Sequence, residues 1–274
     1  MFRSASLFAL GALLFLTFFD HVSAATAGCG KSPSLNSGVH TITVNGKQRR
    51  YTLRVPQNYD NKRQYRFIFG LHWLNGDMNA VVSNSYYGLA PLAQESTIFV
   101  APDGLNRGWG NQGGEDITFL DAVRKQVEDA LCVNEKLRFS LGFSYGGAMS
   151  FSLACSKAAD FRGIAVLSGA TLSGCAGGNT PIAFYGQHGT HDSVLPIASG
   201  RQIRDRFLSL NGCQAKNAPE PSNGSGTHIK TVYNGCKYPT QWTAFDGDHV
   251  ALPGDRGAPS FTPKDVWTFF SQFT

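Results

Sequence analysis

Short β-rich segments alternate with amphipathic helical segments along most of this 274-residue chain. Runs of β-branched and aromatic residues predict strands at residues 40–44, 50–55, 65–71, 96–101, 137–141, 163–168, 181–186 and 241–245. Apolar residues at helical spacing predict helices at 116–131, 147–156 and 199–210, and a last helix from Pro263 to about Phe273. Asn45-Gly46 between the first two strands is typical of a β-hairpin. This pattern predicts an α/β fold with a mostly parallel central sheet and helices on both faces.

The first 24 residues have the pattern of a secretory signal peptide. Arg3 precedes an apolar run at about residues 7–19, and small residues follow at 23–25. The run is shorter than the roughly 18 apolar residues of a membrane span, so an uncleaved anchor is the less favoured alternative. We expect cleavage after Ala24, with the positions one and three residues later as alternatives, and a soluble extracellular product.

The composition and net charge do not indicate a specific class of binding partner. Hydrophobic residues make up 42% of the chain, and no internal repeat or long Pro/Ser/Thr linker occurs, so we expect residues 25–274 to form a single domain. The formal net charge is +5, but the basic residues are scattered. Because no basic stripe with interleaved aromatic residues is present, we expect no nucleic-acid partner. A solvated basic surface is a simpler interpretation of the charge than adhesion to acidic polysaccharide.

All six cysteines lie beyond the predicted signal peptide, at Cys29, Cys132, Cys155, Cys175, Cys213 and Cys236. An even number of cysteines in an oxidising compartment predicts three disulfides. Closeness in sequence favours Cys155 with Cys175 and Cys213 with Cys236, which leaves Cys29 for Cys132. No Cys-x-x-Cys pair occurs, so we expect no structural zinc site. Asn223-Gly-Ser lies in a polar stretch and is a predicted glycosylation site.

The segment LGFSYGG, residues 141–147, places Ser144 between a predicted strand and a predicted helix. The chain contains 31 glycines, so the Gly-x-Ser-x-Gly pattern can arise by chance. The strand-to-helix context is nevertheless the one that a nucleophile elbow requires, and Gly142 and Gly146 permit a sharp turn there. We therefore interpret Ser144 as a nucleophile rather than as a buried structural serine.

A serine nucleophile needs a base and an acid, and in hydrolases with this elbow they follow in the order Ser, Asp or Glu, His. His249 lies in the loop after the last predicted strand, before the last helix. Asp192 follows the strand at 181–186 and precedes a helix. We predict that Ser144, Asp192 and His249 form a catalytic triad.

Other polar residues near the predicted triad have alternative interpretations. His228 lies in a polar stretch and is expected at the surface, and Asp246 and Asp248 are too close to the base in sequence to be the first choice of acid. His188 and His191, with the predicted acid immediately after them, could also bind zinc. No fourth ligand is evident and the triad already explains the acid, so we predict neither metal nor cofactor.

The tetrahedral intermediate of an acyl transfer needs two hydrogen-bond donors directed at its oxygen. The backbone N–H of Tyr145, immediately after the nucleophile, is the first predicted donor. The second is expected from the loop after the strand at 65–71, where the N–H of Trp73 or of Leu74 is the best candidate. These three residues are the predicted oxyanion hole.

Five motifs in order, FGLHWLNGD, APDGLNRGWGNQGGED, GFSYGGAMS, HGTHDSVLP and WTAFDGDHVALPG, resemble the secreted fungal feruloyl esterases of types B and D. These enzymes belong to carbohydrate esterase family 1 and are related to polyhydroxybutyrate depolymerases. The resemblance spans nearly all of the chain beyond the signal peptide. It implies an α/β-hydrolase fold with Ser144, Asp192 and His249 as the triad. Some of these enzymes carry a cellulose-binding module, and we expect no carbohydrate-binding module here.

The resemblance also implies a substrate class: hydroxycinnamoyl esters, such as ferulate or p-coumarate on plant cell-wall arabinoxylan. Trp73, Trp109, Tyr145, Tyr86 and Tyr87 lie in or near loops that could open toward the site, and the first three are predicted substrate contacts. Aromatic side chains also fill cores, so each has an alternative role. Acetyl-xylan esterase, polyester depolymerase and a non-catalytic wall-binding protein remain the alternative functions. The oligomeric state is not predicted.

Overall fold

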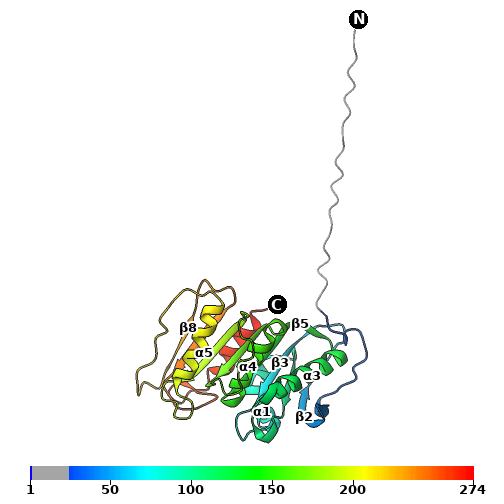
Figure 1. Cartoon of the computed structure of the whole chain (residues 1–274), viewed down its shortest axis with the longest axis horizontal. Helices are drawn as coiled ribbons and strands as arrows, with labels where there is room; N and C mark the ends of the chain where they lie inside the picture. The colour runs from blue at the N-terminus through cyan, green and yellow to red at the C-terminus, as the bar shows by residue number, and fades with distance from the viewer. Residues whose placement is uncertain (2–24) are drawn as a thin grey trace.

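The computed structural model describes residue 1 and residues 25–274, and the predicted signal peptide lies outside these residues apart from Met1. A nine-stranded mixed sheet runs through the molecule in the order β1-β2-β4-β3-β5-β6-β7-β9-β8 (Figure 1). The strands are β1 Gly38–Val44, β2 Lys47–Arg54, β3 Tyr65–Leu71, β4 Thr97–Pro102, β5 Val133–Phe143, β6 Gly163–Leu167, β7 Ala183–Gly189, β8 His228–Val232 and β9 Thr240–Phe245. Neighbouring strands from β4 to β9 are parallel, while β1, β2 and β8 pair antiparallel. The predicted α/β architecture is therefore confirmed.

The predicted hairpin joins β1 and β2. Asn45 and Gly46 both have positive φ, 50° and 75°, as a two-residue turn between right-twisted strands requires. Val44 pairs directly with Lys47 across this turn. The turn residues thus set the register of the two antiparallel strands that begin the sheet.

Helices cover both faces of the sheet. Helices α3 Glu115–Ala130, α4 Tyr145–Lys157 and α5 Ile197–Leu210 lie over the face that is nearer the viewer in Figure 1. Helices α1 Met78–Ser83, α2 Ser85–Leu92 and α6 Thr262–Ser271 bury their apolar residues against the other face. Short 3-10 turns occupy Leu105–Arg107, Gln112–Gly114, Ala158–Asp160 and Asp255–Gly257. Within residues 25–274, no helix is long and apolar enough to cross a membrane.

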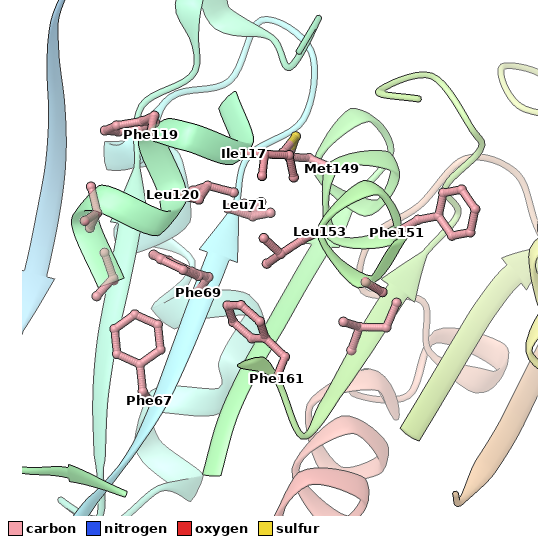
Figure 2. Close-up of a cluster of buried hydrophobic side chains, with 14 of the residues drawn as sticks. Phe67, Phe69, Leu71, Ile117, Phe119, Leu120, Met149, Phe151, Leu153 and Phe161 are labelled. Carbon is pink, nitrogen blue, oxygen red and sulfur yellow. The ribbon is translucent and has the colours of Figure 1, made fainter. Parts of the chain in front are cut away.

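Strand β3 shows how both faces are filled. Phe67, Phe69 and Leu71 point toward α3 and α4, where Figure 2 shows them among side chains such as Leu120 and Leu153. The intervening Ile68 points to the opposite face and joins the cluster of α2 and α6. Because alternate residues of a strand face opposite ways, a strand buried on both faces must be apolar throughout. This burial explains the unbroken apolar run at residues 67–71 within the predicted strand.

Three elements were not predicted. Strand β8 is a polar edge strand with exposed alternate residues, so it lacks an apolar face that sequence patterning could detect. Helices α1 and α2 are short, and α2 is interrupted by positive φ at Tyr86, Tyr87 and Gly88. His228, expected at the surface, is partly exposed but does not lie in a loop: it begins β8, and its ring stacks on Phe261 with centroids 3.8 Å apart.

The structure contains three disulfides: Cys155–Cys175 and Cys213–Cys236, the pairs favoured by closeness in sequence, and Cys29–Cys132, the pair that remained. The Cys29–Cys132 bond joins residues 103 positions apart and attaches the segment before β1 to the start of β5. The other two bonds close spans of 20 and 23 positions. The first bond therefore constrains the unfolded chain most.

Removing the long-range disulfide should destabilise the protein more than removing a short-range one. In the chain-entropy model, the cost of Cys29→Ser with Cys132→Ser should exceed that of Cys213→Ser with Cys236→Ser by about 1.3 kcal/mol, because the spans are 103 and 23 residues. Urea unfolding of the two double variants, refolded side by side, measures this difference. Equal free energies of unfolding would contradict the entropic account of these bonds.

Candidate active site

Ser144 lies between the end of β5 and the start of α4. Its φ of 56° and ψ of −118° are rarely adopted by a residue with a side chain. A Cβ atom on Gly142 would overlap the backbone of Gly146, and one on Gly146 would overlap the carbonyl oxygens of Leu71 and His72. Both glycines are therefore required by close contacts around a sharp strand-to-helix turn, which is the geometry of a nucleophile elbow.

The environment of Ser144 leaves its hydroxyl available. Its backbone N–H donates to the carbonyl oxygen of Leu167 at 2.9 Å, which anchors the turn to β6. Among residues 25–274, the Ser144 Oγ atom has no hydrogen-bond partner, and the residue is 8% exposed. The first N–H groups of α4 follow directly and lack partners within the helix, so the site has a positive potential suited to a developing oxyanion.

Asp192 and His249 come together from the loops after β7 and β9. The His249 Nδ1 atom lies 2.7 Å from Asp192 Oδ2, and the Asp192 side chain is fully buried. Asp192 Oδ1 accepts hydrogen bonds from the backbone N–H groups of Val194 and Leu195, at 3.0 and 2.7 Å. An ionised carboxylate can only accept, so this contact keeps the proton on Nδ1 and leaves Nε2 as the basic nitrogen.

Phe143 connects this pair to Ser144. The His249 ring packs on the Phe143 ring with centroids 4.5 Å apart, and Phe143 directly precedes Ser144 in the chain. No hydrogen bond within 3.5 Å joins Ser144 Oγ to His249 in the described residues. Such contacts are often long before substrate binds and shorten in the reacting complex. The structure thus brings Ser144, Asp192 and His249 to one edge of the sheet.

His188 also contacts Asp192, and the sequence did not predict this role for it. Its Nε2 atom is 2.7 Å from the Leu195 carbonyl oxygen and 3.3 Å from Asp192 Oδ2, so Nε2 carries a proton that is shared between the two oxygens. Burial lowers the pKa of His188 below its usual value. His191 contacts Asp246 instead, at 3.0 Å, so the zinc arrangement considered from the sequence does not converge here.

Lowering the pH should destabilise the protein because His188 is buried. Its pKa is lowered in the folded state, so below about pH 6.5 the unfolded chain binds a proton that the folded chain excludes. The free energy of unfolding should therefore fall as pH decreases from about 6.5, by up to about 1.4 kcal/mol per pH unit for this group. His188→Gln should flatten this slope in urea unfolding between about pH 7 and 5. An unchanged slope would contradict the assignment of a neutral His188.

The loop after β3 is held by two aromatic side chains. The Trp109 indole N–H donates to the His72 carbonyl oxygen at 2.8 Å. The His72 Nε2 atom accepts from the Gly104 N–H at 2.9 Å, so its Nδ1–H donates to the Trp73 carbonyl oxygen at 2.8 Å. In a trans peptide the N–H points opposite to the C=O, so these contacts also orient the N–H groups of Trp73 and Leu74. In the described part of the chain neither N–H has an acceptor.

The aromatic residues considered as substrate contacts fall into two groups, fully buried and partly exposed. Trp109, Tyr86 and Tyr87 are at most 2% exposed, and Trp109 packs on His72 with ring centroids 4.8 Å apart. The assignment of Trp109 to substrate contact does not fit this burial, because a fully covered ring has no face to offer. Trp73 and Tyr145 are partly exposed and remain available to a substrate.

A serine on a strained strand-to-helix turn, with a buried aspartate and a histidine on the loops after two later parallel strands, places the molecule among the α/β-hydrolases. Solved structures agree on the fold. An acetyl xylan esterase from Aspergillus awamori superposes with a TM-score of 0.63 and 16% identity, over 85% of this chain and 99% of that one. A CE1 ferulic acid esterase from Anaeromyces mucronatus gives 0.60 and 14%, over 87% and 90%.

Sequence comparison identifies the family, which the fold alone does not. The chain is 48% identical to a probable feruloyl esterase C of Aspergillus terreus over 252 residues, which cover 90% of this chain and 92% of the relative. It is 47% identical to feruloyl esterase D of Neurospora crassa over 277 residues, with coverage of 95% and 96%. No protein-family model matches. The chain belongs to the family of fungal feruloyl esterases C and D.

Proposed function

We propose that this chain is a secreted serine esterase that hydrolyses hydroxycinnamoyl esters, such as feruloyl and p-coumaroyl esters, of plant cell-wall polysaccharides. The observation that carries the mechanism is the 2.7 Å contact between His249 and buried Asp192 beside the strained turn of Ser144. Membership of the feruloyl esterase family supports the substrate class. Feruloylated arabinoxylan is the proposed natural substrate.

In the proposed reaction, Ser144 Oγ attacks the ester carbonyl carbon while His249 Nε2 accepts the hydroxyl proton. Asp192 stabilises the resulting imidazolium through the Nδ1 contact. Collapse of the tetrahedral intermediate breaks the bond to the alcohol, which leaves with the proton from Nε2, and the acyl group remains on Ser144. Water then attacks the acyl-enzyme by the same route and releases the hydroxycinnamic acid.

The proposed oxyanion hole consists of the Tyr145 N–H and the N–H of Trp73 or Leu74. Tyr145 is the first residue of α4, so its N–H has no partner within the helix. The close approach of Gly146 to the carbonyl oxygens of Leu71 and His72 brings the β3 loop against this helix end. The partly exposed rings of Trp73 and Tyr145 are the proposed contacts for the planar hydroxycinnamoyl group.

Extracellular location is proposed from the N-terminal pattern and the disulfides. Residues 1–24 are the proposed signal peptide, and residues 25–274 the proposed catalytic domain. Three disulfides persist in an oxidising compartment. The exposed side chain of Asn223 is a proposed glycan site, because a surface position tolerates the bulk of a sugar chain.

Relative kcat/KM tests the substrate assignment, since discrimination between esters is a difference in transition-state binding. We expect methyl ferulate, methyl caffeate or methyl p-coumarate to be hydrolysed with much higher kcat/KM than acetylated xylan or a hydroxybutyrate oligomer. A fluorophosphonate probe should label Ser144 in the same preparation. Preference for the acetyl or hydroxybutyryl ester, with Ser144 still labelled, would overturn the substrate and leave the serine mechanism in place.

A further inference from the structure

His249 is held less firmly than its partner Asp192. The Asp192 side chain is fully buried, and the amides of Val194 and Leu195 in its own loop hold its carboxylate. The His249 side chain is 12% exposed, and its ring has only Phe143 and Asp192 as close polar or aromatic partners in the described residues. The backbone position of His249 therefore decides whether its Nε2 atom can reach Ser144.

One exposed carboxylate connects the His249 backbone to the loop after β7, which carries Asp192 and is called the acid loop here. Asp248 Oδ1 accepts the His249 N–H at 2.7 Å and, from the residue after Asp192, the Ser193 N–H at 2.7 Å. The Ser193 hydroxyl also donates to Asp248, at 2.8 Å to Oδ1 and 3.1 Å to Oδ2. A single side chain thus ties the residue adjacent to the acid to the backbone of the base.

The other contacts between these two loops lie further from the triad. Thr190 N–H donates to the Phe245 carbonyl oxygen at 2.8 Å, and His191 N–H donates to that of Gly247 at 3.1 Å. These bonds join the ends of β7 and β9. They do not involve residues 248–250, the tip of the loop after β9, which carries the base and is called the base loop here. Within the described residues, Asp248 is the one side chain at that tip, apart from His249 itself, that forms a hydrogen bond across the gap.

From these contacts we infer that Asp248 is a positioning residue of the esterase, which aligns His249 with Ser144 by tying the base loop to the acid loop. The inference rests on the proposed triad. Asp248 does not touch the reacting atoms, and it acts through the His249 backbone. Backbone hydrogen bonds from Ser193 hold the pKa of Asp248 below its usual range, so the acceptor stays ionised at mildly acidic pH.

Asp248→Ala removes the acceptor of all three donors. A base displaced by about 1 Å can cost on the order of 100-fold in rate, so we expect kcat to fall by about 10- to 100-fold with KM for methyl ferulate unchanged. Asp248→Asn keeps a carbonyl oxygen for the same donors, and kcat should return to within about threefold of the unsubstituted enzyme. Asp255→Ala is the control, because it removes another carboxylate that contacts a histidine, His228, at 2.8 Å, away from the triad.

The measurements are kcat and KM on methyl ferulate, thermal unfolding, and the rate of labelling by a fluorophosphonate probe, all on the full secreted protein. Slow labelling and low kcat in Asp248→Ala at unchanged KM, with rescue in Asp248→Asn, support the inference. Unchanged kcat in Asp248→Ala, or an equal loss in Asp248→Asn, would overturn it. If Asp248→Ala does not fold, Asp248→Glu and Ser193→Ala decide. The longer Glu side chain moves the carboxylate away from the His249 N–H, so kcat should fall, while Ser193→Ala removes only the hydroxyl contact and should retain most of kcat. Unchanged kcat in Asp248→Glu would overturn the inference. Failure of the unsubstituted protein to label or to turn over would instead refute the proposed function.

Discussion

Ser144→Ala is expected to lower kcat by about four to six orders of magnitude while the fold survives, because alanine offers no nucleophile and the residual rate comes only from binding and the oxyanion donors. The strained backbone at φ 56° accepts alanine as well as serine, since both carry a Cβ atom. The measurement is kcat on methyl ferulate with purified variant, beside the melting temperature.

Ser150→Ala is the matched control for this variant. Ser150 lies in α4, the helix that begins directly after Ser144; it is fully buried, and its hydroxyl is 2.8 Å from that of Ser140. Losing this bond should cost about 1 kcal/mol of stability and leave kcat nearly unchanged. A large loss of kcat in both variants would mean that the site responds to packing in α4. Near-normal turnover by Ser144→Ala would remove Ser144 from the mechanism.

Asp192→Asn should lower kcat by about 10⁴-fold with little change in the fold. The amide oxygen can still accept from the N–H groups of Val194 and Leu195, so the amide nitrogen is left to face His249. That nitrogen donates, and the imidazole must then carry its proton on Nε2, where it cannot accept one from Ser144. The rate of fluorophosphonate labelling measures the loss directly, because labelling requires the same proton transfer.

Asp246→Asn is the corresponding control. Asp246 lies 3.0 Å from His191, whose side chain is 46% exposed, in the same pair of loops. The chemical change is identical, but this pair does not contact Ser144 or His249. We expect labelling and kcat to stay within a few-fold of the unsubstituted enzyme. An equal loss in both variants would indicate that loop charge, and not the orientation of His249, controls the rate.

The elements that could be predicted from the sequence are those whose local pattern and final environment agree. Residues 67–71 of β3 are an unbroken apolar run because both faces of the strand are buried there, and Asn45-Gly46 forms the turn between β1 and β2 because both residues tolerate positive φ. The elbow at Ser144 is also local, because its glycines, strand and helix are contiguous in the chain. Asp192 and His249 could be predicted because the order of strands decides which loops meet at one edge of the sheet.

The parts that could not be predicted depend on contacts between distant segments. Strand β8 is polar and belongs to the sheet only through its pairing with β9. Trp109 lies in a loop, where an aromatic ring suggests substrate contact, yet its indole holds the β3 loop 37 positions away. Asp248 carries no local signal for its role, because its partner Ser193 becomes a neighbour only after the loops of β7 and β9 have packed together. His188 is only four positions from Asp192, but the sequence also allowed a zinc site there, and the folded loop decides between the two.

The acyl-enzyme provides the most direct test of the central claim, that feruloyl esters are hydrolysed through Ser144. An activated feruloyl ester should be mixed with the protein, the reaction quenched in acid within the first turnovers, and the peptides analysed by mass spectrometry. An activated leaving group makes acylation fast, so the intermediate accumulates before water releases it. We expect a feruloyl group on the peptide that contains Ser144, forming in a burst and disappearing once substrate is consumed. Continued release of ferulate with the acyl group on another residue, or with the same rate in Ser144→Ala, would contradict the account.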